Sequence, residues 1–260
     1  MNGRVVADVF GTPIDVIDWE TALLRIDSWA NARESRYVCI CNVHSVTTAL
    51  RDRELAQVFR ESSTNTPDGA PVAWLLRRSG HGAQQRINGP DLMLRHAKRA
   101  AVSGQSIYLY GGRETTLKLL HDALIRRYPD LKIAGMHSPP FRALSPEEDQ
   151  EDVDRINASG AGVVWVGLGC PKQEKWMAAH RGRIDAVMIG VGAAFDYHAG
   201  TIRRAPRWMR NAGFEWAHRL ISEPRRLAWR YAVTNSIFIS LVGELMLKKW
   251  LARLSGSERK

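Results

Sequence analysis

Short apolar segments alternate with segments of helical spacing along most of this 260-residue sequence, and this alternation constrains the fold more than any other feature. The apolar segments lie at residues 37–41, 106–110, 131–136, 163–166 and 186–191. Continuous apolar runs between helices are typical of parallel strands that are buried on both faces. We therefore predict an α/β fold: a Rossmann-like, mostly parallel sheet with helices on both faces, preceded by a hairpin around residues 11–13.

Positive charge is concentrated at the C-terminal end of the chain. Residues 203–260 contain thirteen Lys or Arg and four Asp or Glu, so they carry +9 of the net charge of +10. The sequence therefore predicts two parts, a Rossmann-like α/β core over residues 1–202 and a basic, amphipathic C-terminal appendage over residues 203–260. So concentrated an excess predicts an anionic partner: a membrane surface, a nucleic acid or a phosphorylated substrate.

The appendage contains an apolar stretch, residues 232–247, whose only charge is Glu244. It is shorter than the ~20 residues that a membrane-spanning helix needs. One helical face collects Ile237, Phe238, Leu241, Val242 and Leu245. With the basic flank that follows, this face predicts a helix lying on an anionic membrane surface. The alternative is a helix packed on the core or on a second subunit, and we expect a possible homodimer in solution.

The cysteines indicate the compartment. The chain has three, Cys39, Cys41 and Cys170, and its first residues include no apolar signal core, so we expect a protein of the reducing cytosol. Cys39 and Cys41, with Cys170 or His44, offer possible metal ligands. The spaced second Cys/His pair of a zinc site is missing, however, so we expect buried apolar side chains and no metal site.

Glycine-rich turns follow several predicted strands, at the edge of a parallel sheet where ligands bind. Gly-Leu-Gly-Cys-Pro-Lys-Gln-Glu follows one strand at 167–174. Its glycines let the backbone approach a ligand, and the helix that begins after the proline would direct N–H groups at a phosphate. Comparable residues stand at 42–44, 66–69, 110–113 and 190–196. Together they predict a nucleotide-type ligand, although each alone also fits a turn without a ligand.

These motifs occur in an order that resembles a known family. They read NVH at 42–44, TPDG at 66–69, RINGPDL at 86–92, YGG at 110–112, GLGCPKQE at 167–174, GVGAAFD at 190–196, RAP at 204–206, EWAHRL at 215–220 and EPRR at 223–226. Over about residues 4–231 the chain resembles the WecG/TagA/CpsF family, glycosyltransferase family 26. The resemblance implies a Rossmann-like core with a membrane-contacting C-terminal appendage.

The resemblance also implies an activity: inverting transfer of a hexose or N-acetylhexosamine-type sugar from a UDP-sugar to a polyprenyl-diphosphate-linked sugar. The place would be the cytoplasmic face of the bacterial inner membrane, and the enzyme a peripheral one. The product would be an exopolysaccharide, capsule, common antigen or teichoic acid. The donor stays open among glucose, N-acetylmannosamine and N-acetylmannosaminuronic acid. Neither metal nor cofactor is required, which agrees with the lack of an Asp-x-Asp pair after any predicted strand.

Catalytic roles follow from the same resemblance. Asp68 would be the general base that takes the proton from the acceptor hydroxyl, and Arg219 and Arg226 would stabilise the departing diphosphate. A helix over residues 70–76 would begin next to Asp68, and its dipole is expected to keep the carboxylate ionised with a low pKa.

Substrate contacts are implied as well. Asn42 and Gln173 would contact the donor or acceptor, Arg86 would lie near the sugar and Asp196 near the nucleoside. The other predicted substrate-binding residues are Asn88, Gly111, Gly112, Gly169, Lys172, Glu174, Gly192, Arg204 and Arg230.

Three other functional classes remain open on the residues alone. Glycines at strand ends favour a dinucleotide-binding oxidoreductase, but Lys172 stands where the third glycine of that fingerprint belongs. The basic tail with its tryptophans fits a nucleic-acid-binding module, which would leave the strand-end motifs unused, so we expect no nucleic-acid partner. A non-catalytic protein that binds the membrane surface is the third.

Overall fold

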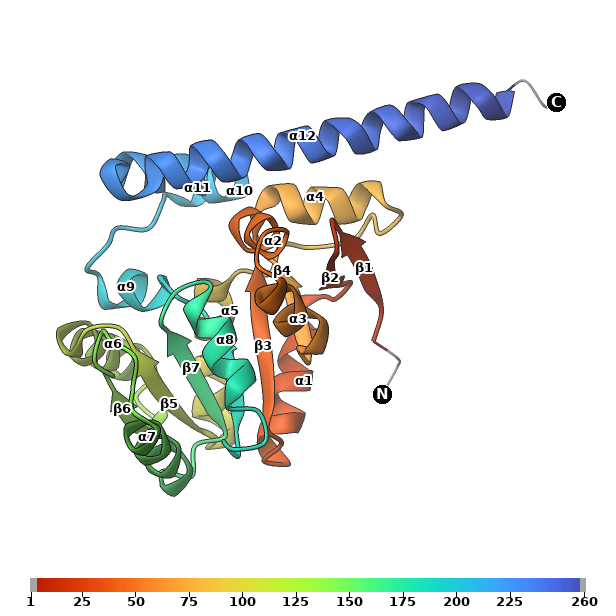
Figure 1. Cartoon of the computed structure of the whole chain (residues 1–260). Helices are drawn as coiled ribbons and strands as arrows, with labels where there is room; N and C mark the ends of the chain where they lie inside the picture. Colours follow the sequence, from red (N-terminus) through yellow and green to blue (C-terminus); the bar gives the residue numbers. More distant parts are fainter. Residues whose placement is uncertain (1–3, 258–260) are drawn as a thin grey trace.

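A computed structural model describes residues 4–257 and begins with a short hairpin (Figure 1). Strands β1 (Val6–Val9) and β2 (Thr12–Asp15) pair antiparallel, as predicted. The turn between them needs positive φ at Phe10 (52°) and Gly11 (81°), the geometry of a tight two-residue hairpin. The hairpin lies beside one edge of the main sheet, where β2 contacts β4.

The main sheet has six strands, all parallel, in the order β4-β3-β8-β7-β5-β6. The strands are β3 (Arg36–Cys41), β4 (Thr64–Pro67), β5 (Ser106–Gly111), β6 (Lys132–His137), β7 (Val163–Gly167) and β8 (Val187–Gly190). The predicted fold class is confirmed, and five of these strands coincide with the predicted apolar runs. The sixth, β4, was not predicted.

Helices cover both faces of this sheet. One face packs against α2 (Val43–Ala49), α3 (Arg53–Glu61), α4 (Ala70–Arg78), α7 (Pro146–Ala158) and α8 (Lys172–Ala179). The other packs against α1 (Trp19–Asn31), α5 (Gly89–Ser103), α6 (Glu114–Arg127) and α9 (Ala194–Ala199).

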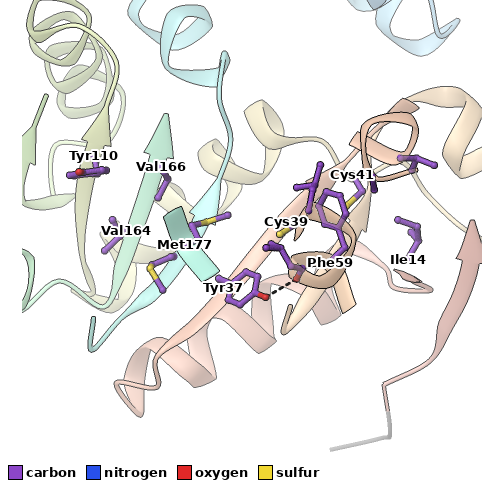
Figure 2. Packing of buried hydrophobic residues seen from close by; sticks show 14 of the residues in the cluster. Ile14, Tyr37, Cys39, Cys41, Phe59, Tyr110, Val164, Val166 and Met177 are labelled. Atoms are coloured by element: carbon purple, nitrogen blue, oxygen red, sulfur yellow. Dashed lines mark hydrogen bonds between the residues drawn. The ribbon is translucent and has the colours of Figure 1, made fainter. Parts of the chain in front are cut away.

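Alternate residues of β3 explain why both faces are apolar. Tyr37, Cys39 and Cys41 enter the first core, while Val38 and Ile40 enter the second, because successive side chains of a strand point to opposite faces. Figure 2 shows the first three along the strand, with the Tyr37 hydroxyl donating to the Val58 carbonyl at 2.7 Å. Both cysteines are buried and apolar in their surroundings, as predicted. Within residues 4–257, no three His, Cys, Asp or Glu side chains are grouped so that they could hold a metal ion.

The chain reverses its direction across the sheet between β5 and β7. After β5, helix α6 on one face leads to the edge strand β6, whereas after β7 helix α8 on the other face leads to β8. In parallel sheets such a reversal opens a crevice at the carboxyl ends of the two strands, which is where ligands bind. The topology therefore marks the carboxyl edge at β5 and β7 as a candidate site.

The C-terminal helices lie across this same edge. They are α10 (Arg207–Asn211), α11 (Glu215–Ser222) and the long α12 (Pro224–Ser257). In Figure 1 the arrowheads of β3 and β7 point toward the end of the molecule that α12 crosses. The predicted boundary between residues 202 and 203 falls in the segment that joins α9 to α10. No helix in the described chain is both long enough and apolar enough to pass through a bilayer.

The expected role of one helical face of α12 was wrong. Phe238, predicted to face a membrane, is 5% exposed and packs edge-on against Phe10, with ring centroids 5.6 Å apart. Val242 and Leu245 pack against the same core, and α12 contacts α2. The alternative of a helix packed on the core is what the structure shows, because the hairpin and α2 present an apolar surface that this face covers.

Candidate active site

Two glycines face each other at the carboxyl ends of β5 and β7. Gly111 ends β5 with φ +106° and is the register partner of Gly167 on β7. A Cβ on Gly111 would lie 2.9 Å from the carbonyl carbon of Gly167, so only glycine fits there. Gly112 (φ +72°) follows, and the Phe195 ring closes over this pair of strands. The predicted residues Gly111 and Gly112 thus lie at the carboxyl edge of the sheet, where the close approach of β7 leaves no room for a side chain on Gly111.

The turn after β7 is held together by its own side chains. The Gly169 N–H (φ +80°) donates to Gln173 Oε1 at 3.1 Å, and Gln173 Nε2 donates to Glu174 Oε1 at 2.9 Å. Gly192 lies against the same Gln173 amide. Glu174 is fully buried, and this burial raises the pKa of its carboxyl. Its buried position differs from the substrate contact that was predicted for it. Gln173 and Glu174 are buried and support the turn through these hydrogen bonds, while Lys172 at the start of α8 is exposed.

Asn42 caps α2, the helix that follows β3, and Asn88 caps α5. Asn42 Oδ1 accepts from the Ser45 N–H at 3.2 Å, and Asn88 Oδ1 accepts from the Asp91 N–H at 2.9 Å. Both therefore satisfy free N–H groups at helix starts. Asn88 Oδ1 also accepts from Arg204 Nη2 at 3.1 Å, which joins the core to the C-terminal appendage.

Asp68 follows β4 directly and stands at the start of α4, as predicted. Its Oδ1 accepts from the Gly69 N–H at 2.6 Å and lies 3.9 Å from Arg86 Nε. The expected low pKa was wrong. Burial raises the pKa of Asp68 to about 6, and the opposing charge of Arg86 compensates only in part. The desolvation cost of a carboxylate that is only 21% exposed outweighs the Gly69 N–H hydrogen bond and the nearby arginines, so the group is a stronger base than expected yet still mostly ionised at pH 7.

A chain of ion pairs runs from Asp68 into the appendage. Arg86 Nη2 lies 2.7 Å from Glu215 Oε2 on α11, and Glu215 Oε1 lies 3.1 Å from Arg204 Nε. Arg204 Nη1 in turn lies 2.5 Å from Asp91 Oδ1. Glu215 therefore brings the predicted residues Arg86 and Arg204 together, and neither Glu215 nor Asp91 had been given a role.

Arginines of the appendage also reach the end of β3. The Arg219 guanidinium lies 5.9 Å from the centre of the Tyr197 ring on α9. Burial, together with the positive charges of Arg230 and then Arg219, lowers the pKa of His44 to about 4. His44 is therefore neutral at pH 7, beside two cations. Arg226 lies on α12, but its side chain falls outside the described part of the structure.

Asp196 is the remaining predicted site residue. It lies on α9, where its Oδ1 accepts from Thr201 Oγ1 at 3.2 Å. Sequence reasoning missed Asp91, Tyr197 and Glu215. Asp91 and Glu215 do stand inside the motifs at 86–92 and 215–220, but single acids in such motifs carry no sign of their partner.

A cavity of about 380 Å³ lies at the opposite, amino-terminal edge of the sheet and is lined by five arginines: Arg4, Arg25, Arg36, Arg60 and Arg181. Their guanidiniums are engaged by neighbours. Arg4 binds Asp15, Arg36 binds Glu34, and Arg181 donates to the Glu61 carbonyl at the end of α3. We assign this cavity no part in the site, because its cations compensate carboxylates and a helix C-terminus.

A comparison with protein families agrees with the geometry at the carboxyl edge. A model described as "Glycosyl transferase WecG/TagA/CpsF family" matches residues 7–254, nearly the whole chain. The match supports sugar transfer in cell-surface polysaccharide synthesis over hydride transfer or nucleic-acid binding. It confirms the resemblance drawn from the motifs: the chain belongs to the WecG/TagA/CpsF family of glycosyltransferases.

Proposed function

We propose that this glycosyltransferase moves a hexose or N-acetylhexosamine-type sugar, with inversion, from a UDP-sugar to a polyprenyl-diphosphate-linked sugar. One observation carries the proposal: Asp68, a desolvated carboxylate with a pKa of about 6, lies at the carboxyl edge near Arg86 of the core and Arg204 of the appendage. A base with a pKa close to the working pH suits proton abstraction from a hydroxyl. Cations beside it suit the charge that develops on a departing diphosphate.

In this mechanism Asp68 takes the proton of the acceptor hydroxyl while that oxygen forms a bond to the anomeric carbon. The bond from that carbon to the UDP oxygen breaks on the opposite side, so the configuration inverts. Arg219, Arg226 and Arg230 receive the negative charge of the departing UDP. The reaction needs no further cofactor, because base and charge stabilisation both come from side chains.

The donor would lie along the carboxyl edge. The nucleotide would lie beside the backbone of Gly111 and Gly112 at the carboxyl ends of β5 and β7, with Lys172 and Asp196 near it. Asn42, Asn88 and Arg86 would contact the sugars. A panel of UDP-sugars tests this assignment by thermal shift: the true donor should raise the melting temperature by mass action, and NAD should not. Stabilisation by NAD alone would favour the oxidoreductase instead.

The appendage would hold the enzyme on the cytoplasmic face of the bacterial inner membrane. Trp208, Ile221 and Trp229 on its three helices are 68%, 78% and 80% exposed. Tryptophans with a basic surround are typical of membrane-interface segments. These residues, rather than the buried face of α12, are therefore proposed to contact anionic lipid. A homodimer in solution stays a prediction.

Replacing Trp208 and Trp229 together with Ser is expected to weaken binding to phosphatidylglycerol vesicles at least about 10-fold, because the apolar area that enters the interface is lost. Co-sedimentation across a lipid titration measures the effect. Val102→Ser removes an 86% exposed apolar side chain at the far end of α5 and serves as control. Equal vesicle binding by the double variant and the control would remove the tryptophans from the membrane contact.

Transfer is expected to continue in EDTA at close to the untreated rate. The carboxylates of the site, Asp68, Asp91 and Glu215, all lie beside arginine guanidiniums, and the appendage arginines supply the positive charge that a divalent ion would bring. The measurement is UDP release with chelator, and with chelator followed by excess magnesium. Activity that disappears in EDTA and returns with magnesium would overturn the metal-free mechanism.

A further inference from the structure

Glu215 stands between two arginines at the junction of appendage and core. Its carboxylate lies 2.7 Å from Arg86 Nη2 and 3.1 Å from Arg204 Nε. The three side chains are only 15% to 20% exposed, so solvent screens these pairs weakly. Glu215 belongs to α11, whereas Arg86 belongs to the core segment before α5, 129 positions away in sequence.

The contacts of Arg86 are unequal. Its short contact goes to Glu215, and Asp68 is left with a separation of 3.9 Å from Nε. A guanidinium that can choose between two carboxylates forms its strongest, paired hydrogen bonds with one of them. Without Glu215, the nearest carboxylate for Arg86 would be Asp68, and a close pair with arginine lowers the basicity of a carboxylate.

We propose that Glu215 is a positioning residue: it holds the Arg86 guanidinium away from Asp68, so that docking of α11 onto the core leaves the Asp68 carboxylate free for the acceptor hydroxyl. This inference rests on the proposed role of Asp68. The charged groups that act on Asp68 are Arg86, Arg204 and Glu215. The appendage would thus prepare the base as well as supply arginines for the diphosphate.

Glu215→Gln is the direct test. Its amide keeps the shape but not the charge, so Arg86 is expected to turn to Asp68. We expect the acidic limb of kcat/KM to move to lower pH by about one unit, as a close opposite charge does to a carboxylate. The plateau of kcat should fall about 10-fold, since a weaker base abstracts the proton less well. The KM of the donor should change little.

Glu244→Gln is the matched control. It removes the same charge from the same appendage, at an exposed position of α12. The acidic limb of kcat/KM and the plateau of kcat in this variant should match those of the unaltered enzyme. A Glu215→Gln variant that loses activity with the limb unmoved would show that Glu215 only holds α11 in place, and the proposal would be wrong.

Carbon NMR titration of the Asp68 carboxyl, without substrates, separates this proposal from the proposed function. Its pKa should fall in Glu215→Gln and rise again in Glu215→Gln with Arg86→Gln, because the guanidinium is then gone. An Asp68 pKa that is the same in all three proteins overturns the role of Glu215. If the pKa of Asp68 changes as expected in the variants but no UDP-sugar is consumed, the proposed function is wrong while the effect of Glu215 on Asp68 is confirmed.

Discussion

Replacing Asp68 with Asn is expected to lower kcat by at least about 10²-fold and to leave UDP-sugar affinity within a few-fold, the usual size of a general-base effect. The amide matches the carboxylate in shape and can still accept from the Gly69 N–H. What it cannot do is take a proton. The measurement is steady-state turnover on a lipid-linked acceptor together with donor affinity.

The pH dependence follows from the same group. With a pKa of about 6, Asp68 is the base only above that value, so kcat/KM of the unaltered enzyme should fall as the pH drops below about 6. The limb should be absent from the residual activity of Asp68→Asn. His44 is a poorer candidate for the general base, since burial and two arginines lower its pKa to about 4.

Stability gives the control for Asp68→Asn. The pKa of this acid is raised on folding, so the unfolded chain releases the proton first as the pH rises from 3.8 to about 6, and the folded state loses stability across that window. Above it, the Asn variant should melt at or above the temperature of the unaltered protein. Near-normal turnover in a variant that melts normally would remove Asp68 from the mechanism.

Arg219→Gln is expected to lower kcat about 10²-fold, the loss seen when one stabilising donor of a developing charge is removed. Arg219 reaches the site from α11, where its buried Nε makes no hydrogen bond in the described structure and pairs with Glu223 Oε2 only at 3.8 Å. An N–H donor without a hydrogen bond can donate to a negatively charged oxygen of the substrate. The Gln side chain keeps a donor but not the charge, so the donor KM should change less than kcat.

The control for this variant is Arg126→Gln, which removes an exposed arginine from the last turn of α6, away from the appendage. Both variants lose one positive charge, so a general effect of net charge would appear in both. Equal kcat values for the two would show that Arg219 does not act on the leaving group.

The strands that sequence predicts best are those whose burial is purely apolar. β3 and β7 are continuous apolar runs because both faces of a parallel strand are covered. β4 was missed because its buried residues are Thr, Asn, Thr and Pro. Asn65 is fully buried there, and its Nδ2 donates to the carbonyls of Pro13 and Phe59. Pro13 lies 52 positions from Asn65 in sequence, so no local pattern reveals the partner that lets this polar segment enter the core.

The site shows the same division. The position of the site at the carboxyl edge of the sheet could be predicted, because glycines at strand ends mark turns whose backbone conformation depends on local sequence. The pKa of Asp68 could not, since it depends on burial and on Arg86 and Glu215, which meet only in the folded chain. The membrane face of α12 was misjudged for a similar reason: an amphipathic helix fits a lipid surface and a protein core equally well until its neighbour is known.

The central claim is sugar transfer at the carboxyl edge of the sheet. The most direct test incubates the purified protein with a polyprenyl-diphosphate-linked sugar and each of a panel of UDP-sugars, and follows the lipid by mass spectrometry. One donor is expected to add a single sugar to the lipid, with inverted configuration and one UDP released for each transfer. No added sugar from any donor, or UDP released while the lipid stays unchanged, would contradict it.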